Sequence, residues 1–141
     1  MPDRSRRRFL AACLTAAGGV LLGARPAWAG ARRLPAGGPH PVPRPGITAD
    51  KVLTSEQLAD APKAIPVFDL VREIPEVVDG IRCQCGCADN PGYYSLLSCF
   101  EGDAMAQHCQ VCQGQGRLTA RLHKEGKTLD EIRIAIDARY G

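Results

Sequence analysis

The feature that most limits how this chain can fold is the crowding of its cysteines. Three of the seven cysteines lie within five residues, and a second pair directly follows a histidine further along the chain. Closely spaced thiols indicate a site for a soft metal ion, a redox site or a disulfide framework. The residues concerned are Cys83, Cys85, Cys87, His108, Cys109 and Cys112.

The first residues of the chain have the pattern of an export signal. Residues 5–10 read S-R-R-R-F-L, which is typical of a twin-arginine signal, and an apolar stretch over 9–24 leads to an A-x-A cleavage site at 27–29. The apolar stretch is too short and too rich in glycine for a membrane span. We therefore expect a twin-arginine signal peptide over 1–29, a periplasmic or other extracytoplasmic location, and no membrane span in the mature chain. An uncleaved N-terminal anchor is the alternative.

The basic character of the whole chain comes from this signal. The chain has 18 Lys and Arg against 15 Asp and Glu, and five arginines and one aspartate precede the expected cleavage site. The mature chain therefore keeps 13 basic and 14 acidic residues, a net charge of −1. No basic stripe with interleaved aromatic residues remains, so we expect no nucleic-acid partner.

The mature chain divides into a linker and one small domain. Prolines and glycines crowd residues 30–47, and this composition favours polyproline II structure or disorder over a packed core. We expect residues 48–141 to form a Cys-rich helical domain. Its size is one at which a hydrophobic core alone is marginal, so a metal ion or disulfide bonds would add needed stability.

The apolar spacing in this domain is helical. Apolar residues repeat at intervals of three and four between Val67 and Ile74, and again behind a T-x-x-E capping box at Thr128. Gly126 separates the last two expected helices and favours a hairpin. We therefore predict a mostly α fold, a small helical domain with a Cys-rich loop and a C-terminal helical hairpin. The expected helices cover 56–61, 67–74, 76–79, 93–100, 104–124 and 128–140.

The spacing of the six cysteines that follow the signal favours metal binding. Gly86 permits the tight turn that directs Cys85 and Cys87 to one centre, and a helix start would place the later pair on one face with the preceding histidine. Thiolates with an imidazole suit Zn²⁺ in a Cys₄ or Cys₃His site, and several thiolates can also hold one or more Cu(I) ions. The candidate metal ligands are Cys83, Cys85, Cys87, Cys99, His108, Cys109 and Cys112.

Two other uses of these thiols stay open. Six cysteines can form three disulfide bonds, in which the cysteines of 83–87 would pair with Cys99, Cys109 and Cys112. Cys109 and Cys112 also form a C-x-x-C pair, and a helix N-terminus stabilises a thiolate that is reactive in thiol–disulfide exchange. The spacings of common iron–sulfur and c-type haem sites do not match.

Four motifs in the domain resemble the exported PCYCGC-motif family. They are C-x-C-G-C at 83–87, S-L-L-S-C-F at 95–100, H-C-x-x-C at 108–112, and a C-terminal run from G-K-T at 126–128 through E-I-R at 131–133 to a final Y-G. Arg82 and Gln84 stand where the motif has proline and tyrosine, while all three cysteines are kept. The resemblance implies an exported, cysteine-rich, metal-binding module.

The C-terminal third is also similar to the H-type thiol reductase of cytochrome c maturation. The resemblance implies that the C-x-x-C pair reduces a disulfide bond of an apocytochrome. The added cluster at 83–87 and the histidine at 108, where that family has arginine, depart from its pattern. The matching residues are Cys109, Cys112, Gln113, Gly126, Lys127, Thr128, Glu131, Ile132, Arg133, Arg139, Tyr140 and Gly141.

We therefore favour a binding module over an enzyme. It would hold Cu(I) or Zn²⁺ between the 83–87 loop and the helix start at 108–112, for metal trafficking, storage or sequestration. A metal donor, a metal acceptor or a redox protein would be its partner. The alternatives are a thiol–disulfide reductase using Cys109 and Cys112, and a disulfide-stapled domain that binds another protein.

Overall fold

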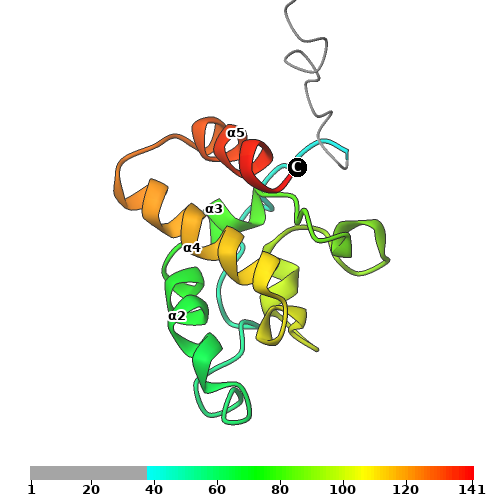
Figure 1. Cartoon of the computed structure of the whole chain (residues 1–141), viewed down its shortest axis with the longest axis vertical. Coiled ribbons are helices and arrows are strands. Elements are labelled where there is room, and N and C mark those ends of the chain that lie inside the picture. The colour runs from blue at the N-terminus through cyan, green and yellow to red at the C-terminus, as the bar shows by residue number, and fades with distance from the viewer. Residues whose placement is uncertain (1–37) are drawn as a thin grey trace, which may run out of the picture. The chain divides into compact units, whose positions relative to one another are not determined.

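A computed structural model of the chain describes residues 38–141 (Figure 1). The expected signal peptide and residues 30–37 of the expected linker lie outside the described residues. The described part has no β-strand, only an isolated bridge between Val52 and Glu101, so the mostly α prediction is confirmed. Its α-helices are α2 (Ile65–Glu73), α3 (Pro75–Asp79), α4 (Gln110–Lys124) and α5 (Leu129–Tyr140).

In the described residues, one 3-10 turn directly precedes α2 and three lie between α3 and α4. Among residues 38–141, no helix has the length and apolar character that crossing a membrane requires. The turns are η2 (Pro62–Ala64), η3 (Cys87–Asp89), η4 (Leu97–Phe100) and η5 (Met105–Gln107).

Helix α4 is the centre of the domain, because it packs against both α2 and α5 (Figure 1). Val67, Phe68 and Val71 form the buried face of α2. The Phe68 ring meets Phe100 edge-on, with the ring centroids 4.8 Å apart. Such an aromatic pair contributes about 0.5–1.5 kcal/mol beyond the burial of its area.

Two glycines allow α4 to approach its neighbours closely. A Cβ at Gly116 would lie 3.0 Å from both the Phe100 ring and a Val67 methyl, and a Cβ at Gly114 would lie 2.5 Å from the Tyr140 hydroxyl. Glycine in a helix costs about 1 kcal/mol relative to alanine. At these two positions the cost is offset by close packing against α2 and α5.

The helical hairpin expected at the C-terminus forms as predicted. Just past the end of α4, Gly126 has a φ of 78°, and the N–H groups of Gly126 and Lys127 donate to the carbonyl oxygens of His123 and Leu122. This is the Schellman pattern of helix termination. The capping box is also confirmed, since the Glu131 N–H donates to the Thr128 hydroxyl and the Thr128 N–H donates to the Glu131 carboxylate.

The structure corrects the expected start of α4. The helix begins at Gln110 instead of 104, because Ala104 has a φ of 41° that a right-handed helix cannot continue. The buried Gln113 side chain donates to the carbonyl oxygens of Ala106 and Gln107, at 2.8 and 3.2 Å, and so holds this 3-10 turn in place.

The predictions of helices over 56–61 and 93–100 are wrong. Residues 56–60 form turns, because a segment this short before Pro62 cannot offset the cost of helix nucleation. In 93–100 only Leu97–Phe100 is helical, as a 3-10 turn. The residues before it are held by tertiary contacts, in which the Tyr94 hydroxyl donates to the Val42 carbonyl at 2.6 Å.

The described part of the expected linker, residues 38–47, lies against the helices. The Arg44 guanidinium and backbone N–H donate to the buried Asp79 carboxylate, and the shortest of these bonds is 2.7 Å. The Arg133 side chain of α5 donates to the Pro41 carbonyl at 2.8 Å and to the Gly80 carbonyl at 3.0 Å. Hydrogen bonds to and from side chains therefore hold this segment in place, although it has no helix or strand of its own.

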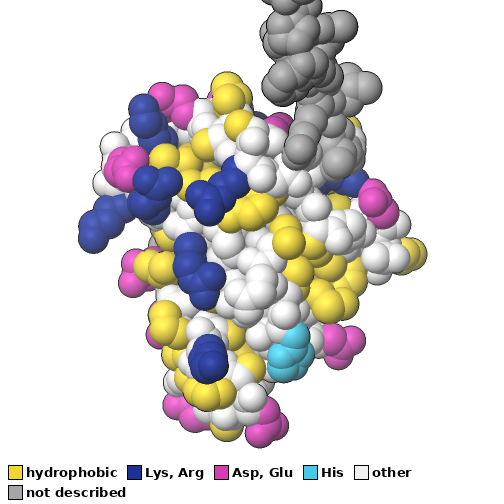
Figure 2. Space-filling view, in the orientation of Figure 1, with side chains coloured by type: hydrophobic (Ala, Val, Ile, Leu, Met, Phe, Trp, Pro, Cys, Tyr) yellow, Lys and Arg dark blue, Asp and Glu magenta, His cyan; other side chains and the backbone are white. Residues whose placement is uncertain are grey.

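The surface over α4 and α5 carries basic side chains with acidic ones among them (Figure 2). Several are paired along the helices, such as Arg121 with Glu125 at 3.4 Å and Lys127 with Glu131 at 3.1 Å. Exposed pairs of this kind contribute little to stability. The mixture of signs agrees with the near-neutral charge of the chain after the expected signal.

Candidate metal centre

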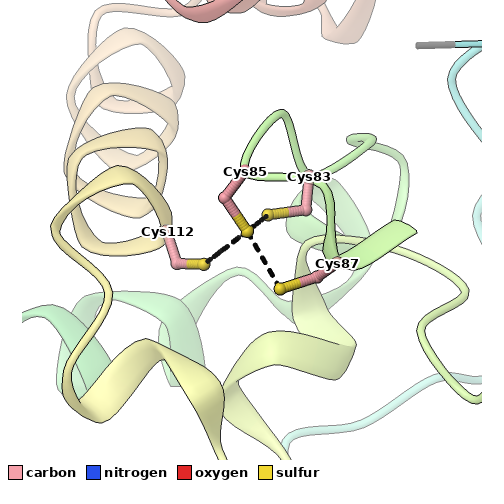
Figure 3. Close-up of side chains that lie close together, drawn as sticks. All are labelled: Cys83, Cys85, Cys87 and Cys112. Carbon is pink, nitrogen blue, oxygen red and sulfur yellow. Dashed lines mark hydrogen bonds between the residues drawn. The ribbon is translucent and has the colours of Figure 1, made fainter. Parts of the chain in front are cut away.

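Four cysteine sulfurs from two segments that are distant in sequence lie close together (Figure 3). Cys83, Cys85 and Cys87 come from the loop after α3, and Cys112 comes from the first turn of α4. All four Sγ atoms lie within 4.8 Å of one another. Three of these residues are buried and Cys85 is half-buried.

The sulfur–sulfur distances suit a small ion at the centre. They are 2.9 Å for Cys85–Cys87, 3.1 Å for Cys83–Cys85, 3.4 Å for Cys85–Cys112 and 3.6 Å for Cys83–Cys112. A tetrahedral Zn²⁺ with bonds of about 2.3 Å sets its sulfurs about 3.8 Å apart, so these pairs need to open by less than about 1 Å. Side-chain rotation can supply a movement of this size.

The loop reaches this arrangement through a sharp turn at Gly86. Its φ is 90°, and η3 begins at the next residue. A residue with a Cβ is strained at this φ, although a Cβ here would contact nothing else. The turn directs Cys85 and Cys87 to the same centre, which confirms the role predicted for Gly86.

Gln115 connects the loop to α4 behind the sulfurs. Its side chain is fully buried, and its Oε1 accepts the Gln84 backbone N–H at 3.2 Å. Its Nε2 lies 3.8 Å from the Cys83 sulfur, so the amide can donate to a thiolate there. Groups that orient ligands in this way tune the affinity of a metal site.

A second connection runs from the loop to α5 through His40. The Arg82 backbone N–H donates to His40 Nδ1 at 2.9 Å, and His40 Nε2 lies 3.1 Å from the Asp137 carboxylate. The Gln84 side chain donates to the same carboxylate at 2.7 Å. These contacts fix the backbone on both sides of Cys83.

The thiols influence one another strongly because they are buried together. Hydrogen bonds from Cys112 and then from Cys99 lower the pKa of Cys83. The pKa values of its neighbours are raised instead. The hydrogen bond to Cys83 raises the pKa of Cys112, and burial raises the pKa of Cys85. The surroundings thus favour ionisation of Cys83 and oppose ionisation of Cys85 and Cys112.

Cys99 lies beside this group of four. It is fully buried in η4 and belongs to the same buried core as Cys83 and Cys112. The hydrogen bond with Cys112 lowers the pKa of Cys99, but the bond with Cys83 and burial outweigh it and raise the pKa. Cys99 therefore belongs to the same cluster of thiols, outside the tightest four.

The structure does not bring His108 or Cys109 into the group of four. Cys109 is the N-cap of α4, where its sulfur accepts the Cys112 N–H at 3.4 Å, and His108 is exposed. The expected shared helical face does not exist, because both residues precede the first residue of the helix. All six cysteines in the described range are free thiols.

Sequence reasoning missed the residues that position the loop. His40 and Asp137 are far from the cysteines in sequence, and no local pattern marks them as neighbours of Cys83. Gln115 offered one signal, because it lies three residues after Cys112, near the face of α4 that turns toward the core. A fully buried glutamine at such a position needs polar partners.

One family model matches the chain over residues 48–141, and its description is a protein of unknown function with a PCYCGC motif. The chain belongs to this family. The predicted resemblance to the PCYCGC-motif family is thereby confirmed, and the C-x-C-G-C motif lies at the sulfur cluster. The similarity to the H-type thiol reductase is not confirmed by this match and stays a prediction. No curated protein and no solved structure is significantly similar to the chain.

Proposed function

We propose that this protein is an exported metal-binding module that holds a thiophilic ion, Cu(I) or Zn²⁺, between the 83–87 loop and the start of α4. The observation that carries the proposal is the convergence of four sulfurs, from Cys83, Cys85, Cys87 and Cys112, within 4.8 Å. Thiolate ligands select these two metals over hard cations such as Mg²⁺ and Ca²⁺.

Metal binding accounts for this arrangement better than disulfide pairing does. Cysteines separated by one residue are strained disulfide partners, and here each of the three loop cysteines faces the same centre. Cys85 lies within hydrogen-bonding distance of three other sulfurs at once, those of Cys83, Cys87 and Cys112. One ion can satisfy all four sulfurs, whereas a disulfide bond joins only two.

The N-terminal pattern supports the location and the role that we propose. The twin-arginine route carries folded proteins, so the thiols would need a ligand before they reach an oxidising compartment. A metal loaded in the cytosol would supply both protection and folding free energy. Trafficking, storage or sequestration of the ion outside the cytoplasm follows from such a carrier.

The test is metal analysis with thiol counting on protein that is expressed in the cytosol and purified without oxygen. We expect near-stoichiometric zinc or copper, and loss of the metal in a variant with Cys83, Cys85 and Cys87 changed to serine. A Cys109→Ser variant is the matched control and should keep the metal. Metal-free protein that forms three native disulfide bonds after export would refute the proposal.

A thiol–disulfide reductase is the second candidate, favoured by the position of Cys109. This thiol is half-buried at the N-terminus of α4, with Cys112 buried behind it. Such a pair can exchange with a substrate disulfide, the outer thiol attacking first. Metal-free protein that reduces a test disulfide, and needs only Cys109 and Cys112 to do so, would support this candidate instead.

A further inference from the structure

Cys109 and Cys112 are neighbours in space that stand in different relations to the sulfur cluster. Cys112 is one of the four clustered sulfurs and is fully buried, whereas Cys109 lies outside the group and is half-buried. The Cys109 sulfur nevertheless turns toward Cys112, because it accepts the Cys112 backbone N–H at 3.4 Å. One member of the pair is therefore a candidate ligand, and the other is a thiol beside it that solvent can reach.

The backbone between the two cysteines has the geometry that a disulfide bond needs. Cys109 is the N-cap of α4, and Gln110 and Val111 are the first residues of the helix. Residues three apart across helical backbone have their Cα atoms about 5 Å apart. Disulfide bonds span Cα separations of about 4.4–6.8 Å, so Cys109 and Cys112 can join with little movement of the backbone.

Cys109 is also the member of the pair that an external disulfide can reach. Its neighbours His108, Gln110 and Val111 are exposed, so the chain around this sulfur borders on solvent. The hydrogen bond from the Cys112 N–H strengthens when the Cys109 sulfur is ionised, and the thiolate is the form that attacks a disulfide. Cys112 has no exposed surface and is shielded from direct attack.

Cys85 is the other cysteine of residues 38–141 that is only half-buried. Its sulfur lies 3.4 Å from that of Cys112, so oxidation could also start there. In the loaded site, however, the electron pair of the Cys85 sulfur is donated to the ion, while that of Cys109 is free to attack. We therefore expect the first reaction at Cys109.

We infer that Cys109 makes release of the bound ion depend on oxidation of the Cys109–Cys112 pair by a disulfide compound. The inference rests on the proposed metal-binding function and adds the regulation of that site. It differs from the second candidate function, because the thiol pair acts on the metal centre of its own chain and not on a substrate protein.

The reaction consists of two exchange steps. The Cys109 thiol gives its proton to the solvent, and its thiolate attacks an external disulfide R–S–S–R, which forms a mixed disulfide and expels one RS⁻. The Cys112 thiolate then leaves the ion, attacks the Cys109 sulfur and expels the second RS⁻. The two cysteines are oxidised to a disulfide bond, the external disulfide is reduced to two thiols that take protons from the solvent, and the ion keeps its charge.

Oxidation of the pair would detach the ion from α4. Cys112 is the only one of the four clustered sulfurs that α4 supplies, and the other three lie within five residues of the loop. Loss of a group that merely supports a ligand lowers metal affinity about 10–100-fold, and loss of the ligand itself should lower it further. Disulfides persist in extracytoplasmic compartments, so the ion would be released after the export that we propose.

The test follows zinc release from the zinc-loaded full chain when oxidised glutathione is added, with a coloured zinc chelator as the reporter. We expect the wild type to lose its zinc, a Cys109–Cys112 disulfide to be the first that peptide mass mapping detects, and dithiothreitol to restore binding. Cys109→Ser should bind zinc as tightly as the reduced wild type and keep it during the same treatment. Serine suits this variant because a serine N-cap also accepts a backbone N–H. Without oxidised glutathione, both chains should keep their zinc.

The outcomes separate the release mechanism from the function on which it rests. Equal zinc loss from Cys109→Ser, a first disulfide that joins Cys85 to Cys112, or a wild type that keeps its zinc would overturn the role of Cys109 while the metal centre stands. Failure of the reduced wild type to bind zinc would overturn the proposed function itself. Should reduced Cys109→Ser bind no zinc, the disulfide mapping on the wild type decides: a first bond between Cys109 and Cys112 supports the inference, and any other first bond excludes it.

Discussion

Gly86 and Gly92 offer a comparison at the scale of single residues. Both have a φ near 90°, and a Cβ at either would meet no other atom within 4 Å. Changing either to alanine should therefore cost about 1–2 kcal/mol of stability from backbone strain alone. Only Gly86 lies between two of the clustered cysteines. We expect Gly86→Ala to weaken metal binding in a chelator competition and Gly92→Ala to leave it unchanged. Equal losses of affinity in both variants would contradict the prediction that the turn at Gly86 positions the metal ligands.

Gln115 is the residue whose side chain links the loop backbone to a sulfur. Gln115→Leu removes both the acceptor for the Gln84 N–H and the donor near Cys83. Loss of such a supporting group lowers metal affinity about 10–100-fold, and we expect an effect of this size in zinc competition. Gln113→Leu is the control, because Gln113 is a buried amide on the same helix that contacts η5 and not the sulfurs. Equal losses in the two variants would contradict the prediction.

At the scale of elements, the contact between α2 and α4 depends on Gly116. Gly116→Val should destabilise the domain by about 1–3 kcal/mol in chemical denaturation, because the added carbons meet Phe100 and Val67. A second change, Val67→Ala, removes one of the methyl groups in the way. The double variant should therefore lose less than the sum of the two single losses. Strict additivity would show that the two positions do not share this contact.

The helices that the sequence predicted well are those whose signals are local. The Thr128 capping box and the apolar spacing from Val67 are sufficient to place α5 and α2. The start of α4 could not be predicted, because Ala104 adopts a positive φ that no local sequence pattern indicates. The later start of α4 also changes the expected set of ligands. Cys112 joins the loop cysteines, while Cys109, three residues earlier, is the N-cap of the helix.

The cysteines of the candidate site could be predicted from the sequence, but the residues that position the loop could not. The loop cysteines, Gly86 and the second segment with Cys112 followed from spacing and chemistry. His40, by contrast, lay in a segment whose composition indicated a linker. Its place beside Arg82 and Asp137 arises because residues 38–47 cover α3 and α5, a contact between positions far apart in sequence.

At the scale of the whole molecule, one buried carboxylate joins three parts of the chain. Asp79, at the end of α3, accepts from Arg44 of the N-terminal segment and from the Ser95 hydroxyl at 2.7 Å. Burial raises the pKa of Asp79, but the hydrogen bonds and charge of Arg44 outweigh this effect and lower the pKa below its usual value. The folded protein thus favours the ionised form.

This shift fixes the sign of the pH dependence. A carboxyl with a lower pKa in the folded state stabilises the fold above its unfolded pKa, about 3.9, and the gain is lost as the pH falls through the folded pKa. We expect Asp79→Asn to cost about 2–4 kcal/mol at pH 7, less than a fully buried pair because Arg44 is 39% exposed. The difference from wild type should shrink toward pH 2 in urea unfolding of the metal-free, reduced chain. A difference that does not change with pH would rule out the charge of Asp79 as its cause.

Metal binding should stabilise the whole domain, because its ligands come from two segments that the ion would join. The ion would tie the loop after α3 to α4, and α4 contacts both α2 and α5. A ligand at 1,000 times its dissociation constant adds about 4 kcal/mol to the free energy of unfolding. Adding Zn²⁺ to the metal-free chain should therefore raise its Tm by about 15–30 °C, and a chelator should reverse the change. Cys85→Ser should show almost no zinc-dependent rise, and Cys109→Ser should keep it. A rise of equal size in both variants would mean that zinc acts elsewhere on the chain, and that the four converging sulfurs are not its site.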